Sequence, residues 1–134
     1  MVVEQVSDTT LVLPILEKAA RAVATEGHVI GVVCEPNLRL PAVAVATLAE
    51  IAAQAVQITM RCAFDGRLGH IWIRLTHQEG RVKLSVSNDG VGAPEEPPAG
   101  FEQIDALATR LGGFARIGAR LFGGSEIAVT YRAA

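Results

Sequence analysis

The feature that most constrains the fold is one long apolar helix with a single polar stripe. Pro41 suits the first turn of a helix, and helical spacing continues to about Cys62. The segment is apolar on nearly every side, which predicts a helix buried inside a domain. Its polar residues recur at steps of three and four and therefore share one face; they are Thr47, Glu50, Gln54, Gln57 and Arg61. That stripe needs solvent, another polypeptide or a ligand beside it.

The segments around this helix predict an α+β two-layer sandwich. Helical spacing follows Pro14 and returns at residues 101–111. Apolar runs or alternation predict five strands, at residues 28–34, 70–76, 82–86, 114–117 and 127–131. The second and third strands form a hairpin around Gln78-Glu79-Gly80. The expected fold has three helices on one face of a mixed five-stranded sheet. We expect a single domain over residues 1–134, with residues 1–10 as a loose N-terminal segment.

Composition narrows the classes of partner. The 134 residues carry a net charge of -2 and no basic run, so nucleic acid is not expected as a partner. The most apolar stretch, Leu40 to Val56, is short and interrupted by polar residues, so no membrane insertion is expected. Cys34 and Cys62 lie far apart in apolar surroundings, which favours reduced thiols in a cytoplasmic protein and no zinc site.

Four short motifs occur in a fixed order. Glu50-x-x-x-Gln54 lies on the long helix, and the hairpin runs into Asn88-Asp89-Gly90-Val91-Gly92; Leu111-Gly112-Gly113 and Gly123-Gly124-Ser125 follow. In this order, over roughly residues 13 to 132, they resemble the GHKL superfamily, and within it the ATP-binding domain of bacterial histidine kinases. Arg39-Leu40-Pro41, before the long helix, resembles the lead-in of one subgroup.

The resemblance implies ATP and Mg²⁺ as cofactors and assigns roles to several residues. Glu50 would be the catalytic carboxylate of an active enzyme, and Gln54 takes the place of the asparagine that binds Mg²⁺. The other nucleotide contacts would come from Asn88, Asp89, Gly90, Gly92, Gly100, Gly123, Gly124 and Ser125.

The sequence departs from the family pattern at three places. Gln54 replaces the Mg²⁺-binding asparagine, and Mg²⁺ tolerates little distortion of its ligands. Asn88 replaces the aspartate that accepts a hydrogen bond from adenine. The segment 93–101 is short, rich in proline and acidic, and retains only Gly100 of the phosphate-binding turn. None of the three histidines is expected on an exposed helix, so no phosphoacceptor is expected; they are His28, His70 and His77.

Three functions remain open. The first is a degenerate ATPase-fold domain that acts in bacterial phosphosignalling as a protein-binding module with weak or no ATP binding. Its partner would be a response regulator, a phosphotransferase or a sigma-factor regulator. The second is the ATP-binding catalytic module of a two-component sensor kinase, and the third is an anti-sigma-factor-like serine kinase or switch. All three rest on the same fold.

Overall fold

The computed structural model describes residues 9–23, 29–62, 69–90, 96–120 and 123–133. The elements are β1 (Thr9–Leu11), α2 (Val12–Val23), β2 (Val29–Val33), β3 (Arg39–Pro41), α3 (Ala42–Cys62), β4 (His70–Gln78), β5 (Arg81–Asn88), α4 (Phe101–Arg110), β6 (Phe114–Ala119) and β7 (Ser125–Arg132). Their order confirms the predicted helices and strands. The predicted start of the first strand at His28, and Gly92 of the predicted nucleotide contacts, lie outside the described residues.

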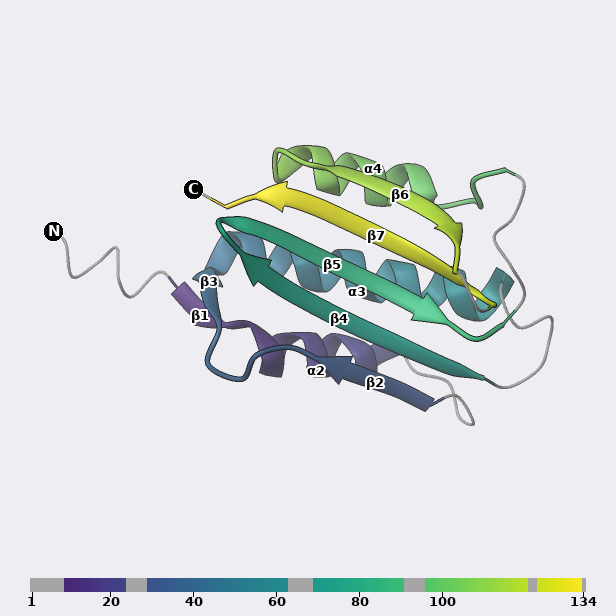
Figure 1. The fold of residues 1–134 in the computed structure, drawn as a ribbon, viewed down its shortest axis with the longest axis horizontal. Coiled ribbons are helices and arrows are strands. Elements are labelled where there is room, and N and C mark those ends of the chain that lie inside the picture. Colours follow the sequence, from purple (N-terminus) through teal and green to yellow (C-terminus); the bar gives the residue numbers. More distant parts are fainter. Residues whose placement is uncertain (1–8, 24–28, 63–68, 91–95, 121–122, 134) are drawn as a thin grey trace, which may run out of the picture.

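Five strands form one mixed sheet in the order β2-β4-β5-β7-β6. β2 runs parallel to β4, and the other neighbouring pairs are antiparallel. In the described part of the chain, helices α2, α3 and α4 cover the same face of this sheet, and no helix lies over the other face (Figure 1). The predicted two-layer α+β sandwich is confirmed.

Alternation along the strands divides the side chains between the two faces. Ile71, Ile73 and Leu75 of β4 point toward the helices and are buried, as the sequence predicted. The same face of β5 carries Val82 and Leu84. The core therefore lies in one layer between the sheet and the helices.

Helix α3 supplies much of that core. Nine of its residues are buried, and it contacts α2, α4 and the sheet. By length and composition alone α3 could cross a membrane, but half of the apolar window is buried inside the domain. Its hydropathy is accounted for by this central position in the sandwich.

A second, small sheet was not predicted. β1 pairs antiparallel with β3, placing Thr9 opposite Pro41. The Arg39 side chain donates from Nη2 to the carbonyl oxygen of Thr9 at 3.0 Å. Two residues of the segment expected to be loose, Thr9 and Thr10, therefore pair with the entrance to α3; residues 1–8 lie outside the described part.

Candidate functional site

Asn88 is the centre of the candidate site, at the end of the central strand β5. Its side chain is 1% exposed, so each polar atom needs a partner inside the protein. Asn88 Nδ2 donates to Ser125 Oγ at 2.8 Å and to the carbonyl oxygen of Ser125 at 3.2 Å. Asn88 Oδ1 accepts from the backbone N–H of Gly90 at 2.8 Å. The fold itself therefore uses both ends of this amide.

The Gly123-Gly124-Ser125 turn brings β7 against the end of β5. A Cβ atom on Gly124 would lie 1.9 Å from the carbonyl oxygen of Asn88, and φ at this residue is +78°. Only glycine combines that conformation with that approach. Gly123 also has positive φ, +107°, but an added Cβ there would meet nothing within 4 Å. Gly124 and Ser125 both contact Asn88, and these contacts are internal to the protein.

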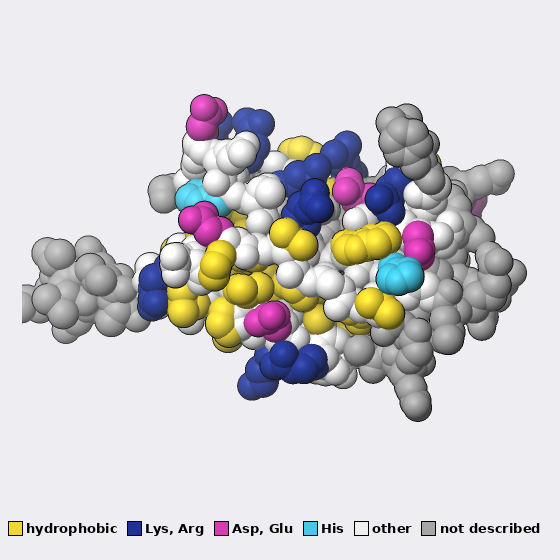
Figure 2. All heavy atoms as spheres, turned by 60° about the horizontal axis from the view of Figure 1, so that its bottom comes forward, with side chains coloured by type: hydrophobic (Ala, Val, Ile, Leu, Met, Phe, Trp, Pro, Cys, Tyr) yellow, Lys and Arg dark blue, Asp and Glu magenta, His cyan; other side chains and the backbone are white. Residues whose placement is uncertain are grey.

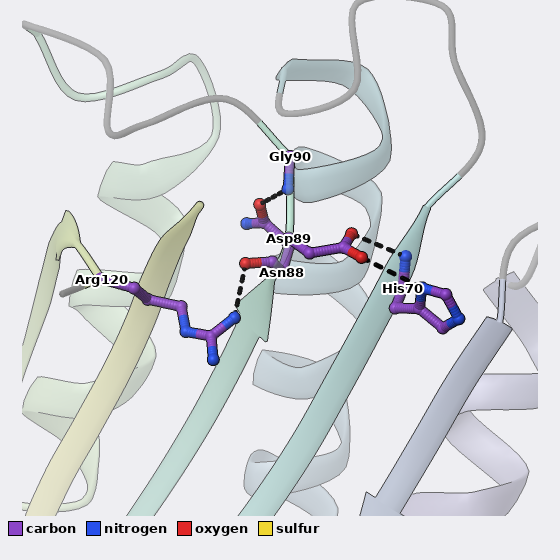
Figure 3. A network of polar contacts seen from close by, with 5 residues as sticks. All are labelled: His70, Asn88, Asp89, Gly90 and Arg120. Atoms are coloured by element: carbon purple, nitrogen blue, oxygen red, sulfur yellow. Dashed lines mark hydrogen bonds and ion pairs between the residues drawn. The ribbon is translucent and has the colours of Figure 1, made fainter. Parts of the chain in front are cut away.

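Asp89 points away from Asn88, toward the start of β4 (Figure 3). Its Oδ1 accepts the backbone N–H of His70 at 2.9 Å, and its Oδ2 lies 3.0 Å from His70 Nδ1. The backbone hydrogen bond from His70 is the largest factor that lowers the pKa of Asp89, and the His70 side chain adds to it. Asp89, expected to contact nucleotide, instead closes the end of the β4–β5 hairpin.

Arg120 lies on the opposite side of Asn88 from His70 (Figure 3). It donates from Nη1 to the carbonyl oxygen of Asn88 at 2.8 Å. Its guanidinium carbon also lies 5.2 Å from the ring centroid of Trp72, within range of a cation–π contact. Sequence inspection did not single out Arg120, because no motif links residues 120 and 72.

The predicted polar stripe of α3 does not act as one surface. Thr47 is buried and donates to the carbonyl oxygen of Val43, one turn earlier, at 3.1 Å. Glu50 is exposed, and Gln54 Nε2 donates to Glu50 Oε1 at 3.4 Å. Gln54 Oε1 is buried and has no hydrogen-bond partner among the described residues. The stripe therefore brings Glu50 and Gln54 together as predicted and leaves one buried amide oxygen unpaired.

The last turn of α3 covers the start of α4. Arg61 donates from Nη2 to the carbonyl oxygen of Ala99 at 2.5 Å. A Cβ on Gly100 would meet Ile58 Cδ1 at 3.5 Å and Arg61 Nη2 at 3.9 Å. Gly100 has φ +95° and precedes α4 as its N-cap, without a side-chain cap. Side chains of α3 thus stand beside the one glycine retained from the phosphate-binding turn.

These contacts fit a bound nucleotide only in part. At the adenine position, both amide hydrogens of Asn88 are used by Ser125, Oδ1 accepts from Gly90, and Asp89 is paired with His70. At the metal position, the unpaired Gln54 Oε1 is a hard oxygen of the kind that Mg²⁺ prefers, with Glu50 beside it. Within the described residues no group of three or more His, Cys, Asp or Glu side chains could hold a metal ion.

Three solved histidine kinase domains have a similar fold. The ATP-binding domain of PrrB from Mycobacterium tuberculosis matches with a TM-score of 0.74 at 16% identity, covering 94% of this chain and 96% of that one. The histidine kinase domain of the Erythrobacter litoralis EL346 blue-light activated histidine kinase gives 0.72 at 17%, covering 90% of this chain and 58% of that one. The E. coli osmosensor EnvZ histidine kinase domain gives 0.69 at 14%, covering 95% and 89%.

The similarity is structural and is not accompanied by a sequence match. Neither the protein-family models nor the curated protein sequences give a match. The chain spans 58% of the EL346 kinase domain and 39% of the EL346 chain in a second match. At 14–18% identity the similarity concerns the fold, and each match covers at least 89% of this chain. The chain has the fold of the ATP-binding domains of histidine kinases.

Proposed function

We propose that this chain is a degenerate histidine-kinase-type domain that acts in bacterial phosphosignalling as a protein-binding module, with weak or no ATP binding. The proposal rests on the state of Asn88. Its amide nitrogen donates to the hydroxyl and carbonyl oxygens of Ser125, and its amide oxygen accepts from the backbone N–H of Gly90. An adenine amino group at this position would have to share the buried Oδ1 with Gly90, and no amide hydrogen of Asn88 is left to donate to the nucleotide.

The phosphate end of the site supports the same proposal. Arg61 bonds to Ala99 beside Gly100, so a cationic side chain of α3 already uses a carbonyl group at the α4 start. The backbone N–H of Phe101, the first residue of α4, already donates to the carbonyl oxygen of Pro98 at 3.1 Å and is therefore not free for a phosphate. The sequence before Gly100 contains Glu95 and Glu96, and the negative charges of these two residues would repel a triphosphate.

Isothermal titration of the purified chain with ATP and Mg²⁺ tests the proposal. The expected result is no binding, or binding weaker than about 100 μM. The same titration with Asn88→Ala serves as the control, because this variant lacks the side chain that would recognise adenine. Any heat of binding that remains in the variant is therefore not adenine-specific. Adenine-specific binding tighter than that limit in the unmodified chain would contradict the proposal.

The second candidate is the ATP-binding catalytic module of a two-component sensor kinase. It is favoured by the buried, unpaired Gln54 Oε1 beside Glu50, because an unpaired buried oxygen is costly unless a ligand uses it. Bound ATP and Mg²⁺ would supply the phosphoryl group and its charge neutralisation. In that case Glu50→Gln should lower a measured ATPase or phosphotransfer rate by at least ~10-fold, and an unchanged rate would remove this candidate.

The partner, the type of organism and the compartment are proposed from the similarity to histidine kinase domains and from the cysteines. The partner would be a signalling protein such as a response regulator, a phosphotransferase or a sigma-factor regulator. The matched kinase domains include those of E. coli and Mycobacterium tuberculosis, which supports a bacterial setting. Cys34 and Cys62 are both free thiols, which supports a reducing, cytoplasmic compartment.

A further inference from the structure

We propose that the helix-free face of the sheet is a docking surface for an acidic segment of a partner protein. This inference deepens the protein-binding role proposed above and rests on it, by assigning the chemistry of the partner. The surface lies on the opposite side of the sheet from α3 and α4 (Figure 1), and it shares only Arg120 with the candidate nucleotide site.

Cations dominate this surface. The side chains that define it, here named the basic face, are Arg74, Arg81, Lys83, Arg116, Arg120 and Arg132. They are half of the 12 Lys and Arg residues in a chain whose net charge is -2. Glu126 is the only carboxylate at the outward-facing positions of the described strands. Glu79 and Asp89 lie in turns at the two ends of the face, and Asp89 is paired with His70. Figure 2 shows dark-blue side chains gathered over the sheet, above the apolar edge formed by β2.

The cations of the basic face are placed where they repel one another. Arg81 and Arg132 are direct cross-strand neighbours on β5 and β7. Like charges in that position destabilise a sheet. Neither residue, nor Lys83, makes an ion pair or side-chain hydrogen bond with another described residue. An acidic partner would relieve this repulsion, which gives the face a physical preference for anionic side chains.

Two hollows shape the basic face. One, of about 400 Å³, lies over the hairpin end and is lined by Arg81, Lys83 and Arg132 with the polar side chains of Thr76, Gln78 and Glu79. The other, of about 230 Å³, is lined by Trp72, Arg74, Ser85, Ser87, Arg120 and Glu126. Both are open to solvent on the same face of β4, β5 and β7. Carboxylates of an extended acidic segment could enter each hollow and meet guanidinium groups there.

The arrangement of Trp72 favours protein over single-stranded nucleic acid. Sheet surfaces that bind single strands offer free aromatic faces on which bases stack. Here the Trp72 ring is stacked with His70, with centroids 5.8 Å apart, and Arg120 lies over it. The ring is therefore already covered on this surface. A half-buried Trp beside Arg is instead typical of protein–protein contact centres.

The only tryptophan of the chain reports binding directly. We would titrate the whole chain with a short poly-glutamate peptide at low and at near-physiological salt and follow Trp72 fluorescence. The test variant is Arg81→Glu with Arg132→Glu, which keeps a like-charge pair across β5 and β7 and so preserves the pairing energy of the strands. The control is Lys18→Glu with Arg21→Glu on exposed positions of α2, which changes net charge equally. Thermal unfolding checks that both variants fold.

The expected result is salt-sensitive peptide binding that the test variant weakens by at least about tenfold and the control by less than about twofold. No binding by the unmodified chain, or equal loss in both variants, would overturn the proposal. A parallel titration with a single-stranded oligonucleotide would overturn it if the oligonucleotide bound more tightly than the peptide. The candidate ATP site lies on the helix side of the sheet, whereas the peptide titration tests the opposite face. Tight ATP binding would therefore contradict the proposed loss of nucleotide binding without deciding whether the basic face binds the peptide.

Discussion

Asp89 and His70 are joined by two contacts that close the open end of the β4–β5 hairpin. The backbone N–H of His70 donates to Asp89 Oδ1 at 2.9 Å, and His70 Nδ1 lies 3.0 Å from Asp89 Oδ2. The backbone N–H of Asp89 in turn donates to the carbonyl oxygen of His70 at 3.3 Å. Asp89 is thus held to His70 by two side-chain contacts and one backbone hydrogen bond.

This pairing predicts a pH dependence. The pKa of Asp89 is lowered below its ordinary value of 3.8, chiefly by the His70 backbone N–H. A carboxyl whose pKa is lower in the folded state contributes stability that is complete above its unfolded pKa and is lost as pH falls through the folded pKa. Asp89→Asn should therefore lower the free energy of unfolding by about 0.5–1 kcal/mol at pH 7, since both groups are largely exposed. In urea unfolding series the difference should vanish at strongly acidic pH. A difference that persisted there would contradict the assignment.

Gly124→Ala should be among the most damaging single substitutions. Its Cβ would meet the Asn88 carbonyl oxygen at 1.9 Å, in a backbone conformation of positive φ. We expect a loss of more than about 3 kcal/mol in the free energy of unfolding, or failure to fold. Gly123→Ala is the matched control: it shares positive φ but has open space around the added atom, so a loss of about 1 kcal/mol is expected. Thermal unfolding of the two variants decides, and equal losses would refute the role of close packing.

Asn88→Asp would recreate the family aspartate, yet it should not recreate the site. The carboxylate cannot donate to Ser125, whose carbonyl oxygen lies 3.2 Å from the present amide nitrogen. A buried charge would then face a carbonyl oxygen, with an expected loss of about 1–3 kcal/mol in stability. Chemical denaturation measures that loss, and calorimetry with ATP should show no gain in affinity. Ser125→Ala, which leaves the Ser125 carbonyl as acceptor, should cost less than Asn88→Asp.

Arg120→Ala should change the environment of the single tryptophan. The substitution removes the guanidinium over Trp72 and the donor to the Asn88 carbonyl oxygen. We expect Trp72 emission to shift to longer wavelength as water reaches the ring, and stability to fall by about 1–2 kcal/mol. Arg120→Lys keeps the charge but loses the planar group, so it should recover only part of both effects. Unchanged emission in the alanine variant would show that Arg120 does not cover the ring in solution.

Gln54→Leu separates the two candidate functions. Without a ligand, the substitution removes a buried oxygen that has no partner, so stability should be unchanged or higher by up to about 1 kcal/mol. If Gln54 binds Mg²⁺ with nucleotide, the same variant should lose any Mg²⁺-dependent stabilisation by ATP. Thermal unfolding with and without ATP and Mg²⁺ gives both results in one experiment.

The fold was predictable because its signals are local and agree with one another. The alternation of Ile71, Ile73 and Leu75 and the turn at Glu79-Gly80 fixed the hairpin, and the burial of α3 followed from its composition. The hairpin register also carried information that sequence inspection did not use. Gln78 opposite Arg81 places Ile71 opposite Asn88, and the same register carried one step further puts His70 opposite Asp89. Their pairing could therefore have been anticipated.

The fate of the motif residues depended on contacts between distant segments. Asn88 matches a nucleotide position in the sequence, but its partner Ser125 is 37 residues away and approaches only when β7 lies beside β5. The contact of Arg61 with Ala99 spans 38 residues and depends on how α3 meets the α4 start. Strand pairing between Thr9 and Pro41 likewise has no local pattern, because three-residue strands are too short to alternate.

The packing of Gly124 on Asn88 also bears on how such a motif drifts over evolutionary time. Selection for folding alone would retain this glycine, because any larger residue forces two strands apart. The signature can therefore outlast the chemistry that it marks in active kinases. Under the proposed function, the persistence of Gly124 reflects folding, whereas the residues at positions 54 and 88 reflect the nucleotide chemistry.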